Sequence, residues 1–195
     1  MRHLIALAAV CALATFAAAC ASPASRFYTL NAATTPSTTP SALSIAVGPV
    51  SVPAVVDRPE IVVSTGPNQV RLDEFNRWAS PLQNNISRVV AENLVAMLGT
   101  PRVTLFPQTL SADADYRVAV EVQRFESTLG ESTLLDAVWA VRRAKDGKSE
   151  TGRTRVRETV PQNGYDALVA AHSRAVARMS QDIADAVRAL GRAAP

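Results

Sequence analysis

Residues Ser80–Gly99, SPLQNNISRVVAENLVAMLG, decide the fold, because they predict a well-defined helix between two groups of apolar strands. Apolar side chains recur there every three or four positions, the spacing of one face of an α-helix. Ser80 is expected to cap the helix with Gln83 in a capping box, Pro81 suits the first helical position, and Gly99 ends it. We expect this face to dock on a sheet. Its apolar positions are Leu82, Ile86, Val89, Val90, Leu94, Met97 and Leu98.

A second, longer amphipathic helix is predicted from Tyr165 to Leu190, with Gly191 ending it. Its apolar stripe repeats at alternating spacings of four and three residues. Such a stripe favours packing against a sheet of the same chain, with a coiled-coil partner as the alternative. The stripe consists of Leu168, His172, Val176, Met179, Ile183, Ala186 and Leu190.

The remaining apolar segments predict strands, because they are rich in β-branched residues or alternate in polarity. Gly66-Pro67-Asn68 and Asp146-Gly147 are expected to turn two hairpins, and Gly48-Pro49 to kink or bulge a strand. The order of elements predicts a single α+β domain: a largely antiparallel sheet with two long amphipathic helices packed on one face. The predicted strands lie within residues 26–30, 43–52, 61–63, 70–72, 103–106, 116–122, 135–141 and 153–160.

The N-terminus has the pattern of a bacterial lipoprotein signal. A short positive region precedes an apolar run and the small residues 17–19, after which comes Cys20. Cys11 lies within the signal, so the mature chain keeps one cysteine, which lipidation would explain. Ordinary secretion, with cleavage after Ala19, is the alternative. We therefore divide the chain into a signal peptide (1–19), a lipidated N-terminus (20–25) and one domain (26–195), with a flexible Thr-, Pro- and Ser-rich segment at 31–41. Ala21, in place of an aspartate, indicates the outer membrane.

Composition and motifs argue against several classes of function. The formal charge of +3 is too small and too scattered for a nucleic-acid-binding face. His172 is the one histidine outside the signal, and its place in an apolar stripe favours a buried histidine over a catalytic base. With one mature cysteine and one histidine, the chain offers neither a zinc set nor a catalytic triad, and it has no phosphate-binding GxxxxGK[ST] loop. We predict no catalytic residue, no metal, no cofactor and no enzyme.

Arginines mark the one notable charge feature, a row at Arg153, Arg155 and Arg157 on one side of a predicted strand. The row favours a solvated face that protects a sheet edge from aggregation. The alternative is a contact for phosphate headgroups or an acidic partner. These three residues are therefore candidates for a partner interface.

Several motifs together resemble the PqiC family, the YmbA-like, ABC-type transport auxiliary lipoproteins. After the lipobox cysteine come RFYTL (26–30), IAVGPVSVP (45–53), DRPEIV (57–62) and RWASPL (77–82). The resemblance covers essentially the whole mature chain. The order and spacing of the motifs are more specific than any one of them. Ser80 departs from the acidic residue more often expected there, although it remains a good helix cap.

This resemblance implies a non-enzymatic role beside a lipid transporter. Family members resemble outer-membrane partners of MCE-type systems, in which an inner-membrane complex with periplasmic MCE rings or tubes carries phospholipids between membranes. By analogy, the protein would be lipid-anchored in the outer membrane, face the periplasm and dock the MCE assembly. A homo-oligomeric ring and contact with phospholipid are further expectations of the analogy. A lipoprotein that regulates cell-wall synthesis is the alternative. Arg58 and Arg77 are further interface candidates, whereas Pro59 and Trp78 suit structural roles.

Overall fold

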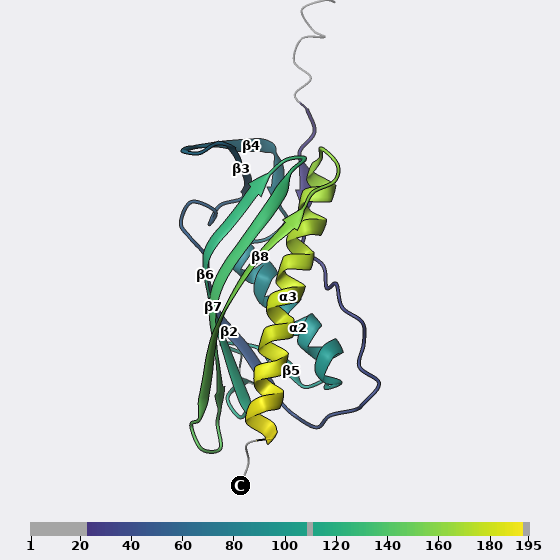
Figure 1. The fold of residues 1–195 in the computed structure, drawn as a ribbon, viewed down its shortest axis with the longest axis vertical. Coiled ribbons are helices and arrows are strands. Elements are labelled where there is room, and N and C mark those ends of the chain that lie inside the picture. The colour runs from purple at the N-terminus through teal and green to yellow at the C-terminus, as the bar shows by residue number, and fades with distance from the viewer. Residues whose placement is uncertain (1–22, 109–110, 193–195) are drawn as a thin grey trace, which may run out of the picture.

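The computed structural model describes residues 23–108 and 111–192 (Figure 1). The predicted signal peptide and the predicted lipidation site, Cys20, lie outside the described residues. The helices are α2 (Leu82–Leu98) and α3 (Tyr165–Arg192). The strands are β1 (Arg26–Tyr28), β2 (Ile45–Ser51), β3 (Glu60–Gly66), β4 (Gln69–Trp78), β5 (Val103–Leu105), β6 (Tyr116–Thr128), β7 (Ser132–Arg143) and β8 (Ser149–Thr159).

The predicted class is confirmed: the chain forms a single α+β domain. The strands divide between a five-stranded sheet, ordered β5-β2-β6-β7-β8, and a three-stranded sheet, ordered β1-β4-β3. The longest ladders, β6 with β7 and β7 with β8, are antiparallel. In place of the single, largely antiparallel sheet that we expected there are two sheets, and β2 runs parallel to both β5 and β6. A parallel pair needs a long crossover connection, and the chain that links β2 to β5 contains β3, β4 and α2.

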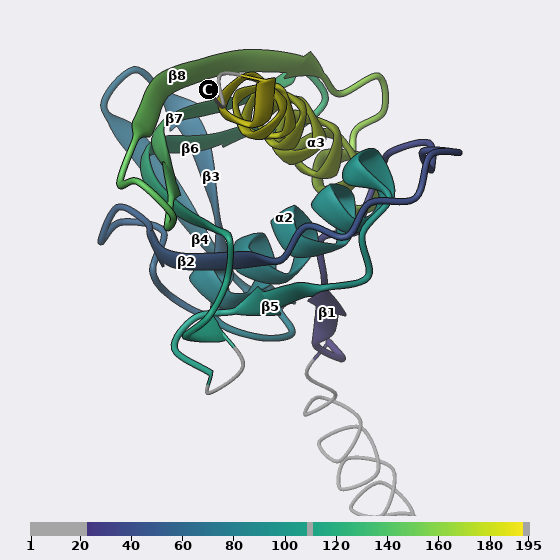
Figure 2. The same ribbon diagram turned by 90° about the horizontal axis from the view of Figure 1, so that it is seen from below.

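Both helices pack on the same face of the five-stranded sheet, as predicted. Figure 2 shows the sheet bending around them, with α3 beside β7 and β8 and α2 beside β2 and β5. The helices also contact each other. Because the curved sheet covers the apolar stripe of α3, that face is used within the domain and is not left for a coiled-coil partner.

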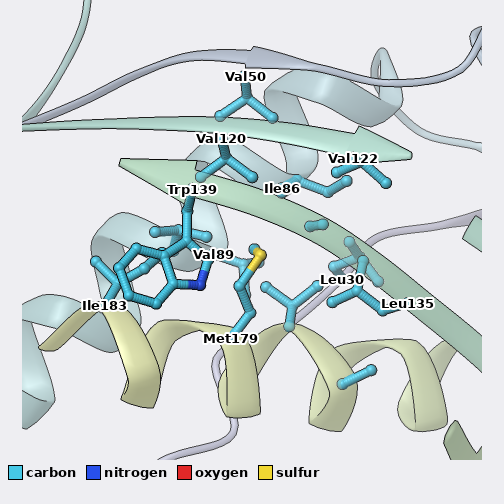
Figure 3. Close-up of a cluster of buried hydrophobic side chains, with 14 of the residues drawn as sticks. Leu30, Val50, Ile86, Val89, Val120, Val122, Leu135, Trp139, Met179 and Ile183 are labelled. Carbon is cyan, nitrogen blue, oxygen red and sulfur yellow. The ribbon is translucent and has the colours of Figure 1, made fainter. Parts of the chain in front are cut away.

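The core lies between the helices and the sheet. Every predicted apolar position of α2 is buried except Met97, which is half-buried, and the whole predicted stripe of α3 is buried. Figure 3 shows Met179 and Ile183 of α3 beneath Trp139 of β7, with Ile86 and Val89 of α2 nearby. At roughly 1.5–3 kcal/mol for each large apolar side chain removed from water, this layer is the main source of stability.

Two predicted helix ends are wrong. Helix α2 begins at Leu82, and its N-cap is Pro81, with no capping hydrogen bond from a side chain. Ser80 therefore lies one residue too early to form the capping box. The carbonyl of Pro81 instead accepts hydrogen bonds from the amides of Asn84 and Asn85, both at 3.0 Å. The second end is that of α3, which continues through Gly191 to Arg192.

Other local predictions hold. Gly99 follows α2 in the left-handed conformation (φ 63°), where a Cβ would overlap the carbonyl oxygen of Thr39. The register of β2 against β6 shifts between Val47 and Val50, and Gly48 has a φ of 126°. The kink predicted at Gly48-Pro49 is thus a bulge. Gly147, with a φ of 72°, lies in the turn between β7 and β8.

The polar segment at 31–41 forms neither helix nor strand and lies along the two helices (Figure 2). Hydrogen bonds fix several of its amides: Asn31 donates to Ser173 Oγ (3.2 Å), Ala33 to Asn93 Oδ1 (3.2 Å) and Ser41 to the carbonyl of Gly99 (2.9 Å). The flexibility predicted for this segment stays a prediction about its dynamics.

Gly152 offers a test of packing on β8. It lies opposite Trp139 of β7, and a Cβ at this position would overlap the indole ring. We expect Gly152→Ala to displace Trp139, weaken its hydrogen bond to Thr154 Oγ1 (3.0 Å) and cost about 2 kcal/mol of unfolding free energy, measured by urea denaturation. The control is Gly66→Ala, where the Cβ would meet only Gln69 at 3.8 Å. Equal midpoints for the two variants would contradict the prediction.

Candidate partner interface

Two of the sequence motifs meet at the three-stranded sheet. The amide of Trp78, at the end of β4, donates to the carbonyl of Pro59 (2.7 Å), just before β3. The next amide, Ala79, donates to the carbonyl of Tyr28 in β1 (2.8 Å). Trp78 is buried and meets Phe125 of β6 edge-to-face, with ring centroids 6.2 Å apart. Trp78 therefore holds this sheet to the main core, and its amide fixes the segment at Pro59.

The structure brings Arg58 and Arg77 together around Glu60. Arg58 Nε lies 3.6 Å from Glu60 Oε2, and Arg77 Nη2 lies 3.2 Å from Glu60 Oε1. Glu60 and Arg77 are also register partners in the ladder of β3 with β4. Both guanidinium groups stay partly exposed, so one carboxylate neutralises two cations only in part. The pair leaves a positive surface suited to a carboxylate or phosphate.

The same motifs line an open pocket of about 390 Å³, which we call the motif pocket. Pro59, Trp78 and Pro81 supply an apolar wall, while Asp57 and Arg58 supply charge. Such a pocket suits an apolar anchor with a polar group beside it. The pocket is lined by Asp57, Arg58, Pro59, Trp78, Ala79, Ser80 and Pro81.

The other three candidate arginines lie elsewhere, on β8 at the edge of the five-stranded sheet. Arg153 binds Asp136 of β7 with two hydrogen bonds of 2.8 Å, and Arg155 Nε lies 3.9 Å from the same carboxylate. Arg157 donates to Ser132 Oγ at 2.8 Å. The five arginines are therefore two groups, one beside the motif pocket and one along a sheet edge.

Asp136 is the residue that the sequence analysis missed. It is buried, and the hydrogen bonds from Arg153 hold the pKa of its carboxyl below the ordinary value, although burial alone would raise it. A signal was present: Asp136 is the one charged residue in the apolar run 134–141, and the next strand carries the arginine row. Part of that row thus serves to neutralise a buried acid.

His172 is fully buried, as its position in the apolar stripe predicted. Its ring stacks on Phe125 with centroids 3.9 Å apart, and Nε2 lies 2.8 Å from Ser127 Oγ. Burial lowers the pKa of His172 to about 3, so the ring stays neutral at physiological pH. A side chain shielded from solvent in this way is poorly placed to act as a general base on a substrate.

Two acidic residues near turns also have structural partners. Asp73 accepts hydrogen bonds from the hydroxyl of Tyr165 (2.6 Å) and the amide of Asn76 (2.9 Å). Burial would raise the pKa of Asp73, but these bonds bring it below the ordinary value. Asp115 accepts hydrogen bonds from the amide (2.8 Å) and hydroxyl (2.7 Å) of Ser44. In the part of the chain that the structure describes, no three His, Cys, Asp or Glu side chains form a group able to hold a metal ion.

The structure is thus a small α+β domain that carries an open pocket between two of its sequence motifs. The chain belongs to the ABC-type transport auxiliary lipoprotein component family, whose model matches residues 28–184. No curated protein sequence matches the chain. No helix within residues 23–108 and 111–192 has both the length and the apolar character needed to cross a bilayer.

Solved structures share the fold. The crystal structure of an uncharacterized protein is 21% identical, with a TM-score of 0.69, and the match covers 85% of this chain and 99% of that one. A protein of the DUF330 family from Xanthomonas campestris is 18% identical, with a TM-score of 0.60, over 82% of this chain and 93% of its own. At these identities the likeness establishes the fold alone.

The buried histidine predicts a pH dependence of stability. The pKa of His172 is about 3 in the folded chain and near 6.5 when unfolded, so below pH 6.5 the unfolded state binds a proton that the folded state does not. We expect the unfolding free energy to fall by up to about 1.4 kcal/mol per unit as pH drops from about 6.5 to about 5, measured by urea denaturation. His172→Gln should remove that slope. In the intact protein, an NMR signal showing protonation of His172 at about pH 5 would contradict the prediction.

The arginine row predicts unequal effects of neighbouring substitutions. Arg153→Gln removes the hydrogen bonds from the guanidinium that lower the pKa of Asp136, whereas the desolvation that raises it remains. The pKa of this carboxyl should therefore rise clearly, measured by carbon-13 NMR titration. Arg157→Gln removes only a bond to Ser132 and should leave that pKa unchanged. Equal pKa values of Asp136 in both variants would show that the row acts as a diffuse charge.

Proposed function

We propose that the chain is a non-enzymatic accessory lipoprotein of an MCE-type ABC system that transports phospholipid between membranes. Anchored in the outer membrane through lipid on Cys20 and facing the periplasm, it docks the periplasmic MCE assembly and so supports envelope integrity. The observation that carries the proposal is that the DRPEIV and RWASPL motifs, which lie at the start of β3 and at the end of β4, line one exposed pocket. Membership of the transport auxiliary lipoprotein family supports it.

The geometry of the motif pocket suits docking. Its position is fixed by backbone hydrogen bonds between β1, β4 and the segment before β3, and by the buried ring of Trp78. A site held by backbone and core has little conformational freedom to lose when a partner binds. Arg58 and Arg77 at its border add charge that fixes orientation and raises the association rate. An apolar anchor from the MCE protein, next to an acidic group, is the complementary surface.

A ring of identical copies is part of the proposal. MCE proteins form rings or tubes, and a homo-oligomeric lipoprotein would present one motif pocket per copy around the end of such a tube. Several weak contacts held at a fixed spacing give high overall affinity without a large interface in any single copy. The arginine row on β8 would face solvent in this arrangement.

Co-purification from native membranes tests the docking site. In the double variant Arg58→Glu/Arg77→Glu, the positive border of the motif pocket becomes negative, and we expect recovery of the MCE protein and its permease to fall about tenfold, measured by quantitative mass spectrometry. The matched control is Arg157→Glu, which reverses an exposed arginine outside the pocket.

The outcomes separate the alternatives. Recovery of the MCE protein with the wild type and the control, but not with the double variant, supports docking at the pocket. Undiminished recovery with the double variant would remove the pocket from the interface. Recovery of cell-wall synthases, with no MCE protein even for the wild type, would replace this function by regulation of wall synthesis. Unchanged thermal unfolding of each variant is the check on folding.

A further inference from the structure

Exposed apolar side chains gather on the three-stranded sheet. Of the seven large hydrophobic residues that are exposed in the described chain, four lie on β1 and β4. Phe27 is 64% exposed, Val70 49% and Leu72 40%. The fourth is Phe75. Single exposed apolar residues are ordinary, but such a cluster on one small sheet marks a surface that contacts something apolar.

The register places Phe27, Val70 and Leu72 on one face of this sheet. In β4, Leu72 pairs with Val62 and Val70 with Ser64, so these side chains share a face. Phe27 precedes Tyr28 and Leu72 precedes Asp73, and because Tyr28 and Asp73 both meet Tyr165 on the opposite side, Phe27 shares this face with Leu72. We call this side, with Phe27, Val70 and Leu72, the outer face.

The opposite side of the sheet faces the core. Tyr28 follows Phe27 and so points the other way, where its ring lies 5.9 Å from that of Tyr165. Asp73, which follows Leu72, accepts a hydrogen bond from the hydroxyl of the same tyrosine. Tyr165 begins α3, so this inner side is covered by the body of the domain.

The outer face lies at the end of the molecule where the chain enters. Figure 1 shows β3 and β4 across one end of the long axis, beside β1, with the C-terminal end of α3 at the other. The described chain starts at Pro23, three residues after Cys20. Three extended residues span at most about 10 Å, so a lipid on Cys20 would keep this end of the domain close to the bilayer.

We propose that the outer face, with Phe27, Val70 and Leu72, rests on the phospholipid surface in which Cys20 is anchored. This inference relies on the lipid anchor of the proposed function and adds the orientation of the domain. Aromatic and aliphatic side chains of this kind enter the boundary between headgroups and acyl chains. With β1, β3 and β4 on the membrane, α3 points its C-terminal end into the periplasm.

Contact with lipid is tested by fluorescence quenching in the full-length, acylated protein. Leu72→Trp and Phe27→Trp each place a reporter on the outer face, while both native tryptophans, Trp78 and Trp139, are buried. The protein is reconstituted into vesicles of phosphatidylethanolamine and phosphatidylglycerol that carry bromine on the acyl chains. The matched control is Phe106→Trp, which replaces an aromatic residue that is 47% exposed and follows β5 on the other sheet.

We expect brominated lipid to quench the indole introduced by Leu72→Trp or Phe27→Trp about twofold more than the indole of the control variant, because only the outer face reaches the acyl-chain boundary. No extra quenching in either variant, while intact mass shows an acylated Cys20 and the protein floats with the vesicles, overturns the inference and leaves the anchor intact. Reduced oligomer mass of Leu72→Asp in detergent, with no quenching of the reporters in vesicles, assigns the face to a second copy of the chain and also overturns it. The vesicles contain no MCE protein, so the quenching result does not depend on whether docking fails in the co-purification experiment.

Discussion

The apolar face of α3 is the interaction on which the other parts of the structure depend. The helix runs along β7 and β8 and against α2, and its stripe from Leu168 to Leu190 is buried throughout. The curved sheet would have an uncovered concave face without it. This helix of 28 residues also fixes the distance between the two ends of the domain. Its first turn contacts the three-stranded sheet through Tyr165, and its last turn contacts Arg143 of β7 through the carbonyl of Leu190. One element thus joins both ends of the domain.

A second constraint connects that core to the motif pocket. Phe125 stacks on His172 of α3 and also meets Trp78 of β4 edge-to-face. Trp78 in turn forms a wall of the pocket and fixes Pro59 through a backbone hydrogen bond. The core therefore fixes the position of the pocket wall. His172 supports this arrangement in its neutral form, because a charged ring in the stack would be costly to bury.

The sequence could predict those features of the fold that depend on residues close together along the chain. The helical stripes, the turn at Asp146-Gly147 and the bulge at Gly48-Pro49 follow from periodicity and turn chemistry, which act over a few residues. Strand pairing depends on segments far apart, so the parallel position of β2 between β5 and β6 had no local signal. The predicted N-cap, Ser80, lies one residue before the observed one, because helix boundaries are set by tertiary packing as much as by propensity.

The candidate site shows the same division. Periodicity indicated that His172 was buried, and the motifs singled out Arg58 and Arg77, but only the fold could show that these two arginines share Glu60 while Arg153 neutralises Asp136. The two groups consequently carry different constraints. Arg153 is bound to a buried acid, whereas Arg77 is the register partner of Phe27 on the outer face. With that face on the membrane, the motif pocket would lie beside the lipid surface. A partner docked there would be held where a phospholipid conduit has to end.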